Sequence, residues 1–228
     1  MKKKKKMSFV YYILLLVAVL LLGYSVYNYL SSKDKTKTTN DDPKDNTKEE
    51  VKKLQIIDLE SDSRPYAVMV NNLSLARPYQ SGLQDAYIVY EIIVEGGITR
   101  YMAVFKDQET ARIGSVRSSR HYFLDYALEN DAIYVHFGWS PQAQSDISTL
   151  KINNINGLYD NAFWRDNTLP VDYEHTAFTS IDKIESMANR KGYRMTSSKD
   201  LVLNYSVDEI NLDKEENATQ ANRVNIVY

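Results

Sequence analysis

Three charged side chains in one short segment could do chemistry together. Glu91, Glu95 and Arg100 are spaced so that they share one face if the segment forms a β-hairpin. Two carboxylates beside an arginine could carry general acid-base catalysis. They could equally form a surface ion pair worth about 0–1 kcal/mol. The residues alone leave both interpretations open.

The hairpin is predicted from two runs rich in apolar residues, 87–95 and 98–106, which are separated by a Gly-Gly pair at 96–97. Such a pair is typical of a two-residue turn, which would place Glu95 opposite Ile98. One face of the hairpin is then nearly all apolar and belongs to the core. The other face carries Glu91, Ile93, Glu95, Ile98, Arg100 and Met102.

A second candidate segment opens a helix that the sequence predicts over 119–130. It reads Arg117-Ser118-Ser119-Arg120-His121, and Ser118 or Ser119 could cap the helix. A helix start attracts anions and disfavours cations, so these basic residues indicate an anion between them. The anion could be a phosphate or carboxylate of a ligand, or a glutamate of the same domain. The candidate ligand-binding residues are Arg100, Arg117, Ser118, Ser119, Arg120 and His121.

The histidines of the chain are His121, His136 and His175. His136 ends a predicted strand, 132–137, and His175 follows Asp172 and Glu174. His136 and His175 are therefore candidate catalytic partners of the two glutamates. No short ligand spacing such as H-x-x-x-H supports a metal site, and we expect neither a metal nor a cofactor.

The elements that would position these residues form an irregular mixture. Strands are expected at 66–71 and 132–137, and helices at 141–150 and 180–190, the last with Ser180 as its N-cap. Residues 224–228 resemble the start of a further strand. Because no βα unit repeats, the class is α+β, with a mixed, mainly antiparallel sheet and a few helices, preceded by one transmembrane helix.

The transmembrane helix is predicted from residues 7–30. Residues 7–32 contain no charge, and a helix needs about 20 apolar residues to cross a bilayer. Five lysines precede the segment, so residues 1–6 should stay in the cytoplasm and the rest should lie outside. A cleaved signal peptide is the alternative, although no small-x-small cleavage site follows the apolar core.

Composition sets further limits on the remainder. Residues 31–53 are almost entirely polar and predict a disordered linker, followed by an extracytoplasmic domain at 54–220. Residues 221–228 would begin a truncated second domain. No acidic residue precedes Asp34, so the body after the anchor is acidic, which argues against nucleic-acid binding. The absence of cysteine excludes disulfides and zinc-thiolate sites.

Several segments resemble one family in the same order along the chain, namely 64–72, 76–78, 80–83, 89–91, 95–100, 116–120, 136–138 and 163–166. Together they are similar to the YerB-like lipoproteins, domain of unknown function 3048, of Gram-positive bacteria. The resemblance implies an exported, membrane-attached envelope protein and supplies no reaction. Many members look like lipoproteins with an acylated cysteine, which this chain lacks, and members continue into a second, C-terminal domain.

We therefore expect a membrane-anchored extracytoplasmic envelope protein that binds an anionic cell-wall polymer or a partner protein. One alternative is a cell-wall glycan hydrolase or lyase that uses Glu91 or Glu95. Another is a structural scaffold in a membrane complex, where the charged residues only hold the fold together.

Overall fold

The computed structural model describes Tyr24, residues 56–206 and residues 210–226. The chain divides into two units, Met1–Val51 and Lys52–Tyr228, and the fold described below belongs to the second. The predicted basic tail and linker lie outside the described residues, as does the predicted transmembrane helix apart from Tyr24. Within the described part, no helix has the length and apolar character needed to traverse a bilayer.

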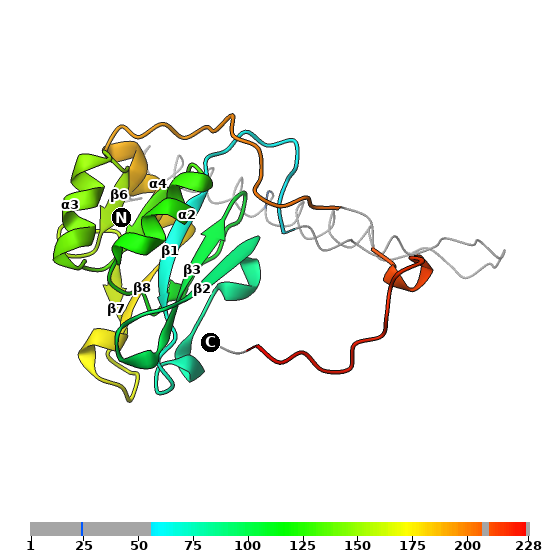
Figure 1. The fold of residues 1–228 in the computed structure, drawn as a ribbon. Coiled ribbons are helices and arrows are strands. Elements are labelled where there is room, and N and C mark those ends of the chain that lie inside the picture. Colours follow the sequence, from blue (N-terminus) through cyan, green and yellow to red (C-terminus); the bar gives the residue numbers. More distant parts are fainter. Residues whose placement is uncertain (1–23, 25–55, 207–209, 227–228) are drawn as a thin grey trace, which may run out of the picture. The chain divides into compact units, whose positions relative to one another are not determined.

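A five-stranded mixed sheet forms the centre of the domain (Figure 1). Its first three strands in spatial order are antiparallel, and its last three are parallel. A second, three-stranded sheet is antiparallel throughout. The predicted α+β class is therefore confirmed. In spatial order the central sheet contains β2 (Ile88–Ile93), β3 (Thr99–Phe105), β1 (Tyr66–Asn71), β5 (Ile133–His136) and β6 (Asn154–Asn156), and the small sheet contains β4 (Ile113–Gly114), β8 (Ala177–Thr179) and β7 (Trp164–Arg165).

The helices cover both faces of the central sheet (Figure 1). Helix α4 (Ile181–Arg190) packs with β4 against one face, and α2 (Leu124–Glu129) and α3 (Pro141–Thr149) pack against the other. Successive residues of a strand point to opposite faces, so each strand contributes to both cores. Single 3-10 turns complete the described part: η1 (Arg77–Tyr79), η2 (Leu83–Asp85), η3 (Glu95–Gly97), η4 (His121–Phe123), η5 (Tyr173–His175) and η6 (Leu212–Lys214).

Helix α4 forms where the sequence predicts it. The Ser180 hydroxyl accepts a hydrogen bond from the Lys183 amide at 3.3 Å, which satisfies a free N–H of the first turn. The apolar stripe of α4 buries Ile184 and Met187 against the sheet. Each such side chain stabilises the fold by about 1.5–3 kcal/mol, so packing and capping agree on this element.

The hairpin of β2 and β3 differs from the prediction in its register. The loop has three residues, Glu95–Gly97, closed by a 2.8 Å hydrogen bond from the Val94 amide to the Ile98 carbonyl. Gly96 and Gly97 both have positive φ, which glycine adopts without steric cost. Because side chains alternate along a strand, the one-residue shift moves every β3 side chain to the other face relative to β2.

The start of the predicted helix 119–130 is also wrong. Residues up to Arg120 run extended, and Ser119 pairs with Trp139 in a β-bridge. Only η4 and α2 are helical, and neither has a side-chain cap. Ser118 and Ser119 therefore do not cap the helix; Arg120 and His121 stand at the start of η4, and Arg117 lies in the extended segment before it.

The other predicted strands and helices agree with the structure except where an element is very short or lies near residue 224. The strands predicted at 66–71 and 132–137 and the helix at 141–150 are present. The short strands β4, β6, β7 and β8 have two or three residues each, too few for a pattern to be visible. Residues 224–226, within the strand predicted at 224–228, form no strand.

One ionisable group lies inside the core at the end of β5. The His136 side chain is fully buried, and its Nδ1 lies 2.7 Å from the Gly138 carbonyl oxygen. Because a carbonyl only accepts, Nδ1 donates, and the unprotonated Nε2 lies 3.2 Å from the side-chain amide of Asn154. Burial lowers the pKa of His136 to about 4, so the ring is neutral at physiological pH.

We expect acid to destabilise the domain through His136. The unfolded chain binds a proton near the ordinary histidine pKa of 6.5, whereas the folded chain binds it only near 4. Stability should therefore fall as the pH drops from about 6.5 to about 4, by up to about 3 kcal/mol from this group. Denaturant unfolding across this range measures the effect. His136→Asn should be less stable at neutral pH but should lose less stability in acid; equal pH slopes would contradict the assignment.

We expect Glu91 and Arg100 to be energetically uncoupled, because the observed register places them on opposite faces of the sheet. A double-mutant cycle with Glu91→Gln and Arg100→Met should give a coupling energy within about 0.5 kcal/mol of zero. The same cycle with Glu95→Gln and Arg120→Met should give a favourable coupling of about 0.2–1 kcal/mol. A clear coupling energy between Glu91 and Arg100 would contradict the three-residue loop and support the two-residue turn that the sequence predicts.

Candidate functional site

Arg100 is carried by β3 on the face that α2 covers. Its side chain is only 6% exposed, and one terminal nitrogen donates to the Ser118 carbonyl oxygen. Burial, followed by the nearby positive charges of Arg120 and Arg117, lowers the pKa of Arg100 to about 10. A buried guanidinium beside two others is costly, so this arrangement needs compensating acceptors or anions.

The other two arginines come from the extended segment after β4. The Arg117 amide donates to the Met69 carbonyl at 2.9 Å, and the Phe137 amide donates to the Arg117 carbonyl at 2.9 Å. The segment therefore crosses the carboxyl ends of β1 and β5, where open α/β sheets commonly bind ligands. We call Arg100, Arg117 and Arg120 the arginine cluster.

Two exposed carboxylates serve as counterions to this cluster. Glu95 accepts a hydrogen bond from Arg120 Nε at 2.5 Å, and Glu174 lies 3.4 Å from a terminal nitrogen of Arg117. The carboxylate side chains are 64% and 62% exposed, against 19% and 20% for Arg120 and Arg117. The hydrogen bond from Arg120 holds the pKa of Glu95 below its ordinary value. Glu95 is thus the internal partner that the sequence suggested, but it is not buried.

A relay of hydrogen-bonding groups positions Glu174. Asn71, the last residue of β1, places its Nδ2 2.8 Å from Nδ1 of the buried His175. The Asn71 Oδ1 accepts from the Leu73 amide, so Nδ2 is the donor and His175 carries its proton on Nε2. That nitrogen lies 3.4 Å from Glu174. Burial, followed by the charge of Arg117, lowers the pKa of His175, which keeps the ring neutral.

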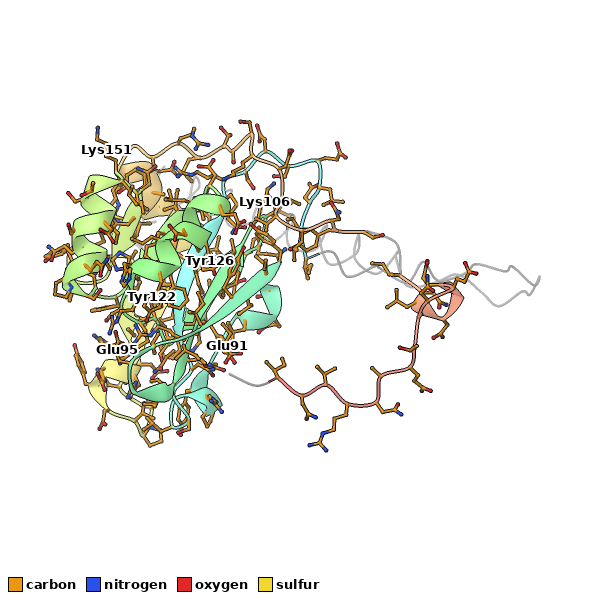
Figure 2. All side chains as sticks on the ribbon, in the orientation of Figure 1. Glu91, Glu95, Lys106, Tyr122, Tyr126 and Lys151 are labelled. Carbon is orange, nitrogen blue, oxygen red and sulfur yellow. The ribbon has the colours of Figure 1, made fainter. Side chains whose placement is uncertain are left out.

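The predicted grouping of Glu91 with Arg100 does not occur. Glu91 lies on the opposite face, where its Oε1 accepts from Thr99 Oγ1 at 2.6 Å and from Asn72 Nδ2 at 3.1 Å. Figure 2 shows Glu91 and Glu95 toward the same end of the hairpin. Only Glu95 of the two joins the arginine cluster.

The remaining predicted residues are scattered. Ser118 donates to the Phe137 carbonyl at 2.9 Å, and the His121 ring contacts Tyr122 with centroids 5.0 Å apart. The His136 ring contacts Trp139, away from His175. In the part of the chain that the structure describes, no group of three or more histidine and carboxylate side chains could hold a metal ion.

Some buried polar atoms have no hydrogen-bond partner among the described residues. Two of them, Ser119 Oγ and the Tyr134 hydroxyl, lie near the arginine cluster, since Arg100 and Arg120 act on the pKa of Tyr134. Burial raises that pKa, and Ser119 opposes the shift without completing a hydrogen bond of ordinary geometry. A third such atom is Nε of Arg117, so the cluster has unused donors.

Sequence reasoning missed the residues that fix the geometry. Asn71 and Glu174 hold His175 and Arg117, yet neither was predicted as a ligand-site residue. A polar residue ending a buried strand is a usable signal for Asn71, because strand ends that meet loops often carry function. Glu174 was noted only as a neighbour of His175, and its pairing with Arg117 gave no signal because the two residues are distant in sequence.

Comparisons with known proteins agree with the resemblance seen in the sequence. Residues 54–194 match the family described as "Protein of unknown function (DUF3048) N-terminal domain". The chain is 44% identical over 138 residues to "Putative lipoprotein YerB" of Bacillus subtilis, covering 59% of this chain and 40% of that protein.

A solved structure gives the same relationship. The crystal structure of YerB from Bacillus subtilis matches with a TM-score of 0.55 and 42% identity, over 59% of this chain and 46% of that one. The chain thus spans less than half the length of these relatives. The chain belongs to the DUF3048 family of proteins of unknown function, through the N-terminal domain of that family.

Proposed function

We propose that this chain is a cell-envelope protein, anchored in the membrane by residues 7–30, whose extracytoplasmic domain binds an anionic polymer through the arginine cluster. In this proposal, residues 1–6 are cytoplasmic, 31–53 are a tether, 54–220 are the binding domain and 221–228 begin a second domain. The observation that carries the binding role is the convergence of the guanidiniums of Arg100, Arg117 and Arg120.

The chemistry of the cluster suits phosphate or carboxylate groups. Guanidinium groups bind either group through paired, charge-assisted hydrogen bonds. The Arg100 and Arg120 side chains are steadied by the backbone carbonyls of Ser118 and Ser119. Because these contacts fix the donors before a ligand arrives, less side-chain entropy is lost on binding.

The exposed glutamates fit the role of exchangeable counterions. Glu95 and Glu174 are mostly in water, so little is lost when a ligand anion replaces them. A polymer with repeated negative charges could replace both glutamates at once and would therefore bind more tightly than a single anion. A partner protein with acidic side chains would use the same chemistry, but a polymer matches the expected position against the wall.

The glycan hydrolase alternative receives less support. A general acid at neutral pH needs a carboxyl with a raised pKa, whereas the hydrogen bond from Arg120 lowers the pKa of Glu95. Glu91 is oriented to the other face of the sheet, so the two carboxylates do not flank one space. The scaffold alternative has no specific observation in its favour.

We predict that Arg117→Ala and Arg120→Ala each weaken binding of inorganic polyphosphate to the full-length protein by about tenfold, because each removes charged hydrogen bonds. Each variant should also lower the salt dependence of binding by about one charge. Glu95→Gln should strengthen binding, because it removes a competing carboxylate. Fluorescence anisotropy of labelled polyphosphate at several salt concentrations measures all three effects.

Arg190→Ala is the matched control, since Arg190 is an exposed arginine at the end of α4. It should leave polyphosphate binding nearly unchanged, and circular dichroism should show every variant folded. Unaltered affinity in both cluster variants would refute the anion site. Weaker binding in Glu95→Gln would contradict the role of this carboxylate as a competing counterion and would show that it positions Arg120 instead.

We predict that the full-length protein fractionates with membranes and that deletion of residues 7–30 releases it, because the apolar segment is long enough to cross a bilayer. Protease added outside intact protoplasts should degrade the domain and spare the lysine-rich end. Intact protein found in the cytosol, or a domain protected until lysis, would contradict the anchor.

A further inference from the structure

A separate cavity of about 500 Å³ lies between α3 and the end of β6. Its volume falls within the range of about 300–1,000 Å³ typical of small-molecule pockets. None of its lining residues belongs to the arginine cluster, and Figure 2 shows Lys151, one of the lining residues, well away from Glu95. The lining residues are Trp139, Gln144, Ile147, Ser148, Lys151, Ile152, Asn154, Asn156, Tyr159, Asp160 and Lys191.

Two aromatic rings form one wall of this cavity. The ring centroids of Trp139 and Tyr159 lie 5.8 Å apart, with the ring planes at 44°, and the buried His136 ring contacts Trp139 at 5.6 Å. Tyr159 is 73% exposed, although a free tyrosine ring would ordinarily gain by burial. The wall therefore offers an apolar surface to a ligand.

A polar residue with an unused donor, Asn156, also lines the cavity. Asn156 is 2% exposed, and its Oδ1 accepts from the Gly138 amide at 2.9 Å and the Leu158 amide at 3.1 Å. These two N–H donors fix which end of the side chain is oxygen. Nδ2 is consequently a donor, and no described residue accepts from it. A buried donor without a partner costs about 1–3 kcal/mol, which a ligand acceptor would recover.

The charges of the cavity largely cancel. Lys191 forms a 3.0 Å ion pair with Asp160, which leaves the exposed Lys151 as the unbalanced charge at the rim. Gln144 adds an exposed amide group that can both donate and accept, whereas the Asn154 amide already donates to the Ile152 carbonyl at 3.2 Å. This lining suits a neutral ligand rich in hydroxyl groups better than a phosphate.

We infer that this cavity binds a sugar ring, stacked on Trp139 and Tyr159 and hydrogen-bonded by the amides of Gln144 and Asn156. A sugar ring has an apolar face of C–H groups and an edge of hydroxyls, each of which donates and accepts. Both features match the aromatic wall and the amide lining. The inference does not depend on the arginine cluster.

The emission of Trp139 provides the test. Trp164 lies in β7, outside the cavity, so Trp164→Phe leaves Trp139 as the reporter in the full-length protein. The protein is kept in a detergent without a sugar headgroup, which would compete. We expect a saturable change in emission with N-acetylglucosamine trisaccharide and none with inorganic phosphate. Tyr159→Ala should weaken the response about tenfold, because one stacking ring is lost.

Two further variants make the result specific. Asn156→Asp retains an acceptor for Gly138 and Leu158 but removes the donor, so it should also weaken the response. Tyr173→Ala removes another exposed tyrosine outside the cavity and should leave the response unchanged. The inference would be overturned if the trisaccharide caused no change in emission or if phosphate alone caused one. It would also be overturned if the protein responded equally with and without the Tyr159→Ala substitution.

Discussion

The carboxyl end of the central sheet is organised around a charge that folding has removed from water, the guanidinium of Arg100. Its desolvation is unfavourable, and Arg117 and Arg120 add like-charge repulsion. The fold compensates by bringing the extended segment after β4 across the strand ends, so that the Ser118 carbonyl accepts from Arg100. That segment also supplies the other two arginines, so the contact that satisfies Arg100 is the one that builds the cluster.

The same face of the sheet continues as a row of polar side chains toward β6. Tyr134 and His136 come from β5, and Asn154 and Asn156 from β6, all at positions that alternate with core residues. Polar groups in a core are usually paired, because an unpaired one is destabilising. Here Tyr134 and Asn156 each retain an unpartnered atom, one beside the arginine cluster and one in the cavity beside α3. The two candidate sites thus lie on one polar row of the sheet and carry different chemistry.

Sequence patterns predicted the elements whose local and long-range preferences agree. Helix α4 has a cap, an apolar stripe and a glycine beyond its end, and it forms as expected. The predicted register of the hairpin was wrong because Gly96 and Gly97 fit a three-residue loop as well as a two-residue one. Side chains alternate along a strand, so an error of one residue places each β3 side chain on the wrong face of the sheet. The predicted helix start at Ser119 was wrong because Ser119 pairs with Trp139 in a β-bridge, and this pairing outweighs its preference for capping a helix. Contacts such as Asn71 with His175 join residues far apart in sequence and cannot be deduced from spacing.

The contrast in exposure across the arginine cluster argues for binding over catalysis. Glu95 and Glu174 remain mostly in water, whereas their arginine partners are mostly buried. A hydrated carboxylate contributes little to a surface ion pair, so either one can leave at low cost. The arginines cannot leave, because their backbone contacts and burial hold them in place. A catalytic carboxylate needs the reverse arrangement, with the acid desolvated and its pKa raised. Fixed cations beside exchangeable anions are instead what an anion-binding surface requires.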